Sequence, residues 1–309
     1  MFVYLDIVEK FACQQCGVCC RNNWLVTVDE AGYLRNRELF QAEGREDEFL
    51  QAFVPLLGEA DYGEYARIAK RASGGCWFLT PENLCRLQQI AGHEHLDTVC
   101  QWFPRYPMDT QRGIEFSLSF SCPAALKLAL REQPLRIVRS EESPIPRLPL
   151  DFVNHVYPSQ QPEHSALHYY FEIEQHLIDL LQQRKLALTE RLSMTRRFVT
   201  ALECLTDPEK MGREINCLVG SDYERIDALA SAGGPDRGGP AQWLIENYFV
   251  NFIFRKSLYS NGFAKTLQQL GLMQERLGGY LHEGVIFDEN DVAQAILQLE
   301  LEYNHNSRK

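Results

Sequence analysis

The 309-residue sequence lacks long uninterrupted apolar runs, an excess of basic residues, and a basic-then-apolar stretch at its beginning. Its richest apolar window, 243–254, contains one glutamate and two asparagines, so we expect no membrane-spanning helix and no membrane partner. Without a secretory signal, the protein is expected to be cytoplasmic. The formal net charge of −11 argues against a nucleic-acid binder, which would normally present a basic surface.

Two motifs that would indicate particular chemistries are also missing. No glycine fingerprint of a nucleotide-binding α/β fold occurs, and the glycine-rich stretch 233–240 follows no predicted strand, so we expect it to be a mobile loop. The spacing C-x3-C-x2-C of radical enzymes is absent, because position 23 is asparagine where a cysteine would have to follow Cys16 and Cys20. The chemistry must therefore come from other residues.

Cysteine is the residue that the sequence has in unusual density. Eight of its ten cysteines lie in the first 122 residues, and four of these fall between positions 13 and 20. In a reducing cytosol, clustered cysteines indicate metal ligands more readily than disulfides, because the compartment keeps thiols reduced. We therefore predict eight metal ligands: Cys13, Cys16, Cys19, Cys20, Cys76, Cys85, Cys100 and Cys122.

Two kinds of metal centre are compatible with the cysteine spacing. The run C-x2-C-x2-C can hold one face of a [4Fe–4S] cluster while a remote cysteine supplies the fourth ligand, and Cys122-Pro123 has the form of such a remote ligand. Eight cysteines can instead form two tetrahedral zinc sites. Because neighbouring side chains diverge, either Cys19 or Cys20 could face a different centre. The sequence leaves iron–sulfur and zinc open.

The remaining cysteines and the nearby histidines are given other roles. Cys204 and Cys217 are expected to be packed thiols on helices, since they lie far from the cluster. His93 and His95 lie between two predicted ligands, where surface positions are expected, although either could replace a thiolate.

Local patterns predict short strands in the N-terminal half. A strand is expected at 24–28, followed by a helix that Asp29 caps, and another strand at 114–122 before a helix that Pro123 opens. One or two amphipathic helices are expected within 46–71. A hairpin with a turn at 80–83 is expected to bring Cys76 and Cys85 close together across its strands. A short helix should carry Leu96 and Cys100 and end before Pro104.

The C-terminal half has a helical pattern. The stretch 143–162 contains five prolines and is expected to be a linker. After a first amphipathic stripe from Leu167 to Leu181, helices are expected at 188–205, 240–259, 264–281 and 289–303. We predict an α+β, predominantly α fold with three parts: a Cys-rich metal-binding domain with short strands (1–135), a proline-rich linker (136–162) and an all-helical domain (163–309).

Several segments together resemble a known family. They are C-x2-C-x2-CC, the tetrapeptide Cys76-Trp-Phe-Leu, the segments 83–87, 99–106 and 118–125, and the helix-like stretch 246–255. This series resembles the flagellin lysine-N-methylase family and the overlapping cysteine-cluster proteins described as zinc- or iron-chelating. The resemblance covers the first 135 residues well and the helical half thinly.

The resemblance implies methyl transfer from S-adenosylmethionine to lysines of flagellin, by an enzyme that contains an iron–sulfur cluster. The helical domain would then be a substrate cradle. Arg105 is a candidate to hold the carboxylate of the cofactor, and Trp102, Phe103 and Tyr106 could form an apolar wall; a structural ion pair and core packing are the respective alternatives. The thirteen tyrosines and the carboxylates do not single out a catalytic base. The alternative function is a non-enzymatic zinc- or iron-chelating protein.

Overall fold

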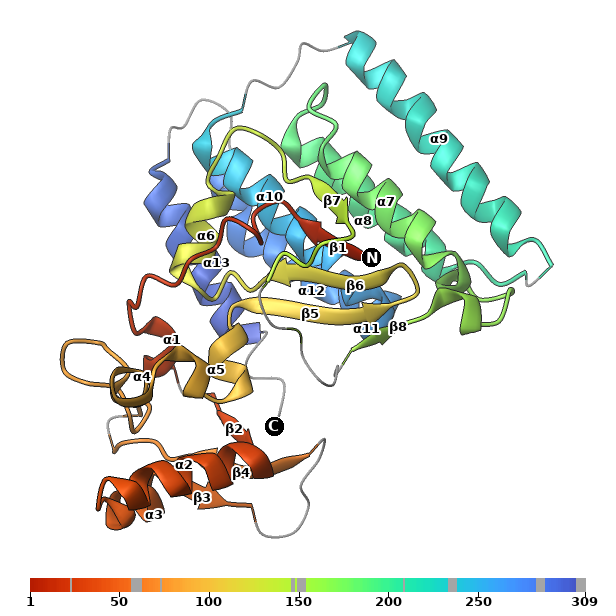
Figure 1. Cartoon of the computed structure of the whole chain (residues 1–309). Coiled ribbons are helices and arrows are strands. Elements are labelled where there is room, and N and C mark those ends of the chain that lie inside the picture. Colours follow the sequence, from red (N-terminus) through yellow and green to blue (C-terminus); the bar gives the residue numbers. More distant parts are fainter. Residues whose placement is uncertain are drawn as a thin grey trace.

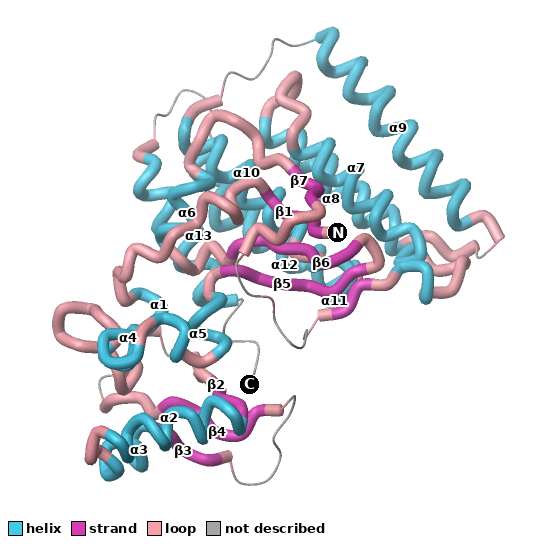
Figure 2. Tube along the Cα trace, in the orientation of Figure 1, coloured by secondary structure: helices cyan, strands magenta, loops and turns pink. Residues whose placement is uncertain are grey.

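The computed structural model describes residues 1–22, 24–56, 63–72, 74–145, 148, 154–207, 209–232, 238–281 and 287–303. The fold mixes helices with short strands, and from Pro158 onward every described element is helical (Figure 2). The prediction of a mixed fold with a helical C-terminal half is therefore confirmed. No helix in these ranges combines the length and the apolar character that crossing a bilayer requires.

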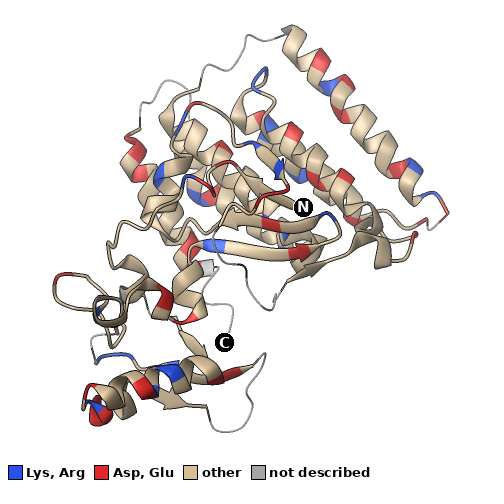
Figure 3. Ribbon diagram, in the orientation of Figure 1, with Lys and Arg blue, Asp and Glu red and all other residues tan. Residues whose placement is uncertain are grey.

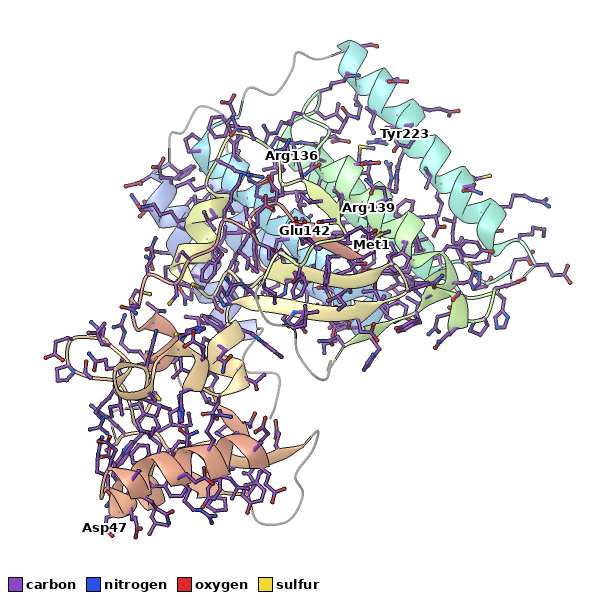
Figure 4. The ribbon with its side chains drawn as sticks, in the orientation of Figure 1. Met1, Asp47, Arg136, Arg139, Glu142 and Tyr223 are labelled. Carbon is purple, nitrogen blue, oxygen red and sulfur yellow. The ribbon has the colours of Figure 1, made fainter. Side chains whose placement is uncertain are left out.

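A five-stranded sheet forms the base of the larger of two bodies (Figure 1). Its order is β7-β1-β6-β5-β8, in which β1 pairs in parallel with β6 and β5 in parallel with β8, while the other pairs are antiparallel. The strands are β1 Phe2–Leu5, β5 Arg105–Thr110, β6 Gly113–Leu118, β7 Ile137–Ser140 and β8 His155–Val156. The edge strand β7 and its flanks carry the charged Arg136, Arg139 and Glu142 (Figure 4), which discourage pairing with another chain.

Helices of the C-terminal half complete the large body. The central one, α10, is buried along its whole length from Leu244 to Phe254 and contacts β6. The predicted helices 188–205 and 289–303 correspond to α8 and α13, and the one at 240–259 is divided into α10 and α11. The helices are α6 Pro123–Ala129, α7 Tyr170–Leu181, α8 Leu188–Glu203, α9 Met211–Ala232, α10 Pro240–Phe254, α11 Ser257–Asn261, α12 Phe263–Leu277 and α13 Glu289–Tyr303.

Two asparagines of the buried helix α10 form hydrogen bonds to neighbouring segments. The Asn247 side chain accepts a hydrogen bond from the backbone N–H of Leu135 (3.2 Å) and donates to the carbonyl of Ala129 (2.8 Å). Asn251 donates to the carbonyl of Leu118 at 2.9 Å. A buried polar group that lacks a partner is costly, so these bonds fix the segment between the end of β6 and the end of α6.

A buried ionic cluster joins β6, α7 and the junction between α10 and α11. Lys256 is fully buried, and its Nζ lies 2.8 Å from Glu115 Oε2 and 2.5 Å from Glu174 Oε1. Arg112 closes the cluster, with Nε 2.9 Å from Glu115 and Nη2 2.6 Å from Glu174. Burial alone would raise the pKa of Glu115, but Lys256 and Arg112 hold it below its usual value. Two cations and two carboxylates therefore balance in charge.

The helix α9, which the sequence patterns did not predict, lies at the edge of the large body and carries both acidic and basic side chains (Figures 1 and 3). A thin inward-facing stripe holds it, including Ile215 and Ile226. Buried Asp222 accepts a hydrogen bond from Nε2 of buried His176 on α7 (3.1 Å) and pairs with Arg197 on α8. The hydroxyl of Tyr223, labelled in Figure 4, donates to Asp179 of α7.

We expect Asp222→Ala to loosen α9 and to lower the free energy of unfolding by about 3 kcal/mol, because it leaves a buried histidine and an arginine without their anion. Limited proteolysis should then cut within α9 before it cuts α10. The matched control is Asp227→Ala, which removes an exposed carboxylate from the same helix. Equal protease resistance of the two variants would contradict this role for Asp222.

The small lobe, residues 18–102, lies apart from the sheet of the large body (Figure 1). Its own core is dominated by Phe40, Phe49, Phe53 and Phe78, whose rings contact one another. Around it lie a three-stranded antiparallel sheet, in the order β2-β4-β3, and several helices. Its elements are α1 Val18–Arg21, β2 Thr27–Asp29, α2 Glu30–Ala42, α3 Glu46–Ala52, β3 Phe53–Pro55, β4 Glu64–Ile68, α4 Arg86–Ala91 and α5 Thr98–Trp102.

The small lobe confirms one local prediction and corrects another. Asp29 caps α2 as expected, accepting a hydrogen bond from the N–H of Gly32 at 2.5 Å. The helices expected within 46–71 are wrong after Ala52, because the chain turns into β3 and returns as β4, which pairs with both β3 and β2.

The two hydrophobic cores do not follow the order of the chain. The larger core contains β1 residues such as Val3 together with residues as distant as Leu299, so it includes both sides of the predicted boundaries at 135 and 162. The division into three domains stays a prediction. Part of the expected linker (146–147 and 149–153) and most of the expected loop at 233–240 lie outside the described residues.

Candidate functional site

The eight cysteines of the N-terminal part line one cavity of about 250 Å³. Four come from the segment 13–20. Of the others, Cys76 follows β4, Cys85 directly precedes α4, Cys100 lies in α5 and Cys122 directly precedes α6. These parts meet between the small lobe and the large body (Figure 1). All eight are free thiols. The structure thus brings together every cysteine that the sequence predicted as a ligand, and metal binding itself stays a prediction.

A glycine lets the first cysteine segment approach the turn at 80–83. Gly17 has a left-handed backbone (φ 68°), and a Cβ there would lie 2.9 Å from both the Cβ and the carbonyl oxygen of Asn83. Arg21 of α1 also donates to the side chain of Asn83. Next to this contact, the N–H of Cys76 donates to the carbonyl of Cys20 at 2.7 Å. Two stretches distant in sequence are therefore held together by backbone contacts.

The turn at 80–83 is present and brings Cys76 and Cys85 to the same cavity, although the two are not paired with each other across it. Cys85 is opposite Leu79, and Cys76 is opposite Lys70, in isolated bridges. The bridges are placed this way because the N–H of Thr80 donates to the carbonyl of Leu84, so the turn closes tightly within 79–85. Cys76 and Cys85 still line the same cavity from different sides of this turn.

Cys122 enters the cavity from the large body. It lies between β6 and α6, and Pro123 occupies the first turn of the helix as predicted. Because Asn251 holds the end of β6 and Asn247 holds the end of α6, helix α10 fixes the position of this cysteine. The cavity therefore includes thiols from both bodies.

The sulfurs of Cys19 and Cys20 are 3.9 Å apart, and one thiol donates a weak hydrogen bond to the other. The hydrogen bond from Cys20 lowers the pKa of Cys19 to about 7, and the same contact raises the pKa of Cys20. Burial is the main cause that raises the pKa of Cys122 to about 11, with Cys16 and Cys19 adding to it. Bound cations stabilise thiolates, so a metal centre would lower the pKa of all these groups.

The donor chemistry suits a thiophilic metal. Among the described residues, no group of three or more His, Cys, Asp or Glu side chains is placed so that it could hold a metal ion. A closed zinc tetrahedron with Zn–S bonds of about 2.3 Å needs sulfurs about 3.8 Å apart. An iron–sulfur cluster binds each thiolate through a different iron and spreads its ligands more widely. Thiolate is a ligand of both zinc and iron–sulfur centres, so the donor chemistry leaves both kinds open.

Arg105 presents an unsatisfied donor to the same cavity. Its Nη2 donates to the carbonyl of Phe11 (3.3 Å) and its guanidinium lies over the Phe11 ring, but its buried Nε has no hydrogen-bond partner. Burial lowers the pKa of Arg105, and the nearby Cys13 partly offsets this. A cation with a free N–H in a partly closed cavity can hold an anionic group.

Apolar side chains form the rest of the wall. Phe103 packs against Trp24 with ring centroids 5.1 Å apart, and Leu25 and Val99 line the cavity while remaining 57% and 42% exposed. Of the aromatic residues proposed from sequence, Phe103 lies on the cavity, whereas Tyr106 accepts a hydrogen bond from Asn154. Trp24, Leu25 and Val99 were missed, because single apolar residues near cysteines carry no recognisable pattern.

The structure also places the two histidines near the cysteines and the two cysteines outside the cavity. His93 lines the cavity and is exposed, so it remains available to the site, while burial lowers the pKa of the neighbouring His95. Cys217 on α9 and Cys204 at the end of α8 are exposed, so the expectation that they are packed thiols is wrong. Their helices turn them towards solvent, since the inward stripe of α9 is formed by other residues.

Comparison with known proteins finds distant relatives. No family model and no solved structure matches the chain. The lysine-N-methylase of Salmonella typhimurium (strain LT2) is 26% identical over 132 residues, 40% of this chain and 31% of that protein. The flagellar biosynthetic protein FliU of Salmonella muenchen is 25% identical over 130 residues, 40% of this chain and 74% of that protein. The match with the lysine-N-methylase of Salmonella choleraesuis is also 26% over 132 residues. The matched stretch spans about a third of the length of the methylases, and the chain is their distant relative.

Proposed function

We propose that this chain is a protein-lysine N-methyltransferase that uses S-adenosylmethionine and contains an iron–sulfur centre. The distant relation to proteins named lysine-N-methylase and FliU supports the reaction class, with flagellin as the substrate. The observation that carries the proposal is the single cavity, in which eight thiols, an arginine with a free N–H and an aromatic pair lie together. Separate groups for a metal, an anion and an apolar ligand are thus within one enclosure.

The local spacing of the first three cysteines is the reason for proposing an iron–sulfur centre rather than zinc. Thiolate is the usual ligand of iron–sulfur clusters, and the run Cys13, Cys16 and Cys19 has the matching local spacing. Cys122 would supply the remote ligand, since it lines the same cavity as Cys13, Cys16 and Cys19. The role of the centre would be to build and rigidify the cavity.

The other cavity residues would bind the two reactants. Arg105 would pair with the carboxylate of S-adenosylmethionine, and the Trp24–Phe103 pair would contact its sulfonium or its base. S-adenosylmethionine supplies the methyl group, which passes to the deprotonated lysine nitrogen and leaves S-adenosylhomocysteine. Leu25 and Val99 would pack on the lysine stem, and their apolar surroundings would lower the pKa of its amine and so favour the reactive form.

The Arg105 assignment predicts a loss of affinity for the methyl donor. Arg105→Met is expected to weaken S-adenosylmethionine binding by about 10- to 100-fold, because a charge-assisted hydrogen bond contributes about 1.5–3 kcal/mol. Isothermal titration calorimetry on anaerobically purified protein measures the affinity for S-adenosylmethionine. Arg67→Met removes an exposed arginine of β4 and should bind like the wild type, while Arg105→Lys should recover part of the affinity. Unchanged affinity in Arg105→Met would refute the assignment.

The function itself is tested by methyl transfer. Protein purified without oxygen is incubated with methyl-labelled S-adenosylmethionine and purified flagellin, and the label is located by mass spectrometry. The proposal expects label on lysine side chains of flagellin, and absence of label together with absence of donor binding would overturn it.

One observation favours the second candidate, a non-enzymatic metal-chelating protein. Cys13 and Cys16 are exposed, and accessible ligands allow a metal to be exchanged with a partner. This candidate expects metal binding without donor binding, and transfer of iron to a metal-free acceptor. Donor binding that depends on Arg105 would exclude it.

A further inference from the structure

The eight cysteines of the cavity do not pack on the same hydrophobic core. Cys76 belongs to the core of the small lobe, and Cys20, Cys85 and Cys100 pack against that core. Cys122 belongs instead to the core of the large body. The thiols are therefore attached to two different bodies.

The segment that carries the remaining cysteines starts from the large body. Phe11 is part of the larger core, and the exposed Cys13 and Cys16 follow it directly. Cys13 lines the cavity together with Arg105, which starts β5 of the large body. These two cysteines and Cys122 therefore lie on the side of the cavity that faces the large body.

Contacts between the cysteines follow the same division. The N–H of Cys76 donates to the carbonyl of Cys20 at 2.7 Å, and Cys20, Cys85 and Cys100 pack against the core that contains Cys76. The sulfur of Cys19 lies 3.9 Å from that of Cys20, so the boundary between the two sets of thiols runs between these adjacent residues.

We propose that the cavity holds two metal centres, each bound by four thiolates. The inner centre is bound by Cys20, Cys76, Cys85 and Cys100, and the outer centre by Cys13, Cys16, Cys19 and Cys122. This inference rests on the iron–sulfur part of the proposed function and is independent of methyl transfer. Both centres are [4Fe–4S] clusters, the kind that takes four cysteines and spreads them widely.

The adjacent pair Cys19-Cys20 is then explained by its position between the centres. In ferredoxins with two clusters, three cysteines of a run bind one cluster and the fourth binds the other. Cys20 has that fourth position here, since it directly follows the run of Cys13, Cys16 and Cys19 and packs on the other core. A single centre would leave four thiols without a metal, including the buried Cys76 or Cys122.

The two centres have different mechanical consequences. All four ligands of the inner centre lie within the small lobe, so this centre cross-links α1, the turn, α4 and α5. The outer centre connects Cys13 and Cys16, which precede the small lobe, and Cys19 of α1 to the start of α6, and so fastens the lobe to the large body. Loss of one centre therefore affects a different part of the molecule than loss of the other.

Metal and sulfide analysis of the anaerobically purified wild-type protein is the first test. Two [4Fe–4S] clusters require about eight iron and eight sulfide per chain. About four of each, or none, would overturn the proposal, and either result leaves methyl transfer to be judged by its own assay.

Matched variants assign the ligands. Cys85→Ser should lose the inner centre and Cys122→Ser the outer one, so each should retain about half of the iron. Cys217→Ser removes an exposed cysteine outside the cavity and should keep all of it. Iron content that does not fall in Cys122→Ser, or that falls to zero in both variants while each stays folded, would overturn the assignment.

A measurement on the wild-type protein avoids variants that fail to fold. Iodoacetamide labelling during stepwise iron removal by a chelator should modify Cys204 and Cys217 at once. The outer four cysteines should follow as one group, because Cys13 and Cys16 are exposed, and the inner four should follow last. Release of all eight together, or labelling of Cys13 before any chelator is added, would refute two separate centres.

Discussion

Replacing Lys256 by methionine is expected to lower the free energy of unfolding by about 3 to 5 kcal/mol, because it leaves two buried carboxylates with one cation. Methionine fills a similar volume, so the lost charge and its hydrogen bonds account for the change. The partly exposed Arg112 would then have to balance the charges of both Glu115 and Glu174. Urea unfolding of the metal-loaded protein, followed by the fluorescence of its tryptophans, measures the loss.

Two comparisons isolate the buried charge. Lys265→Met makes the same chemical change at an exposed position of α12 and should alter stability by less than about 0.5 kcal/mol. Adding Glu174→Gln to Lys256→Met should recover part of the loss, because it removes the unpaired negative charge. If Lys256→Met lowers the free energy of unfolding by less than about 1 kcal/mol, the buried lysine does not stabilise the fold as expected.

Removing the proposed metal centres is expected to unfold the small lobe while the large body stays folded. The described part of the small lobe has thirteen buried core residues, and the proposed inner centre would cross-link four of the cysteines on and around this core. Binding energy at a structural metal centre is folding energy, since the ligands converge only in the folded state. Hydrogen exchange should therefore lose about 100-fold protection, or more, in α2 and β4 of the metal-free protein.

The large body supplies the internal control for this experiment. Helix α10 is buried from Leu244 to Phe254, and its asparagines form hydrogen bonds to Leu118, Ala129 and Leu135 of the large body. Its protection from exchange should therefore be unchanged. Protection of α2 and β4 should return when iron and sulfide are supplied. If the metal-free protein protects α2 as well as the loaded one does, the lobe is stable without a metal centre.

Local signals were sufficient where a residue acts on its immediate neighbours. Asp29 and Pro123 start helices because capping and a fixed φ are properties of one or two residues, and both helix starts were predicted. Helices α8 and α13 were likewise predicted from their periodic apolar residues. Helix α9 was missed, because its inward stripe is thin and contains the charged Asp222.

Strands that depend on distant partners were not predicted. Strand β1 pairs with β6 (Phe2 opposite Ile114), and no local pattern in four residues can reveal such a partner. A helix was expected beyond Ala52 for the same reason, because the pairing of β3 with β4 leaves no local pattern in the sequence. Cysteine density identified the residues that line the cavity, since thiols are rare and their clustering needs a reason. The apolar wall was visible only after folding, because Trp24 and Phe103 are separated by most of the small lobe.

The parallel pairing of β1 with β6 makes the whole small lobe an insertion between two neighbouring strands. During synthesis, β1 cannot pair with β6 until the whole small lobe, which lies between them in sequence, has left the ribosome. Joining such remote strands imposes an entropic barrier that a compact insertion reduces, because it shortens the effective loop. The order of assembly would therefore run from the lobe to the sheet, with most of the cysteines gathered before the larger body closes.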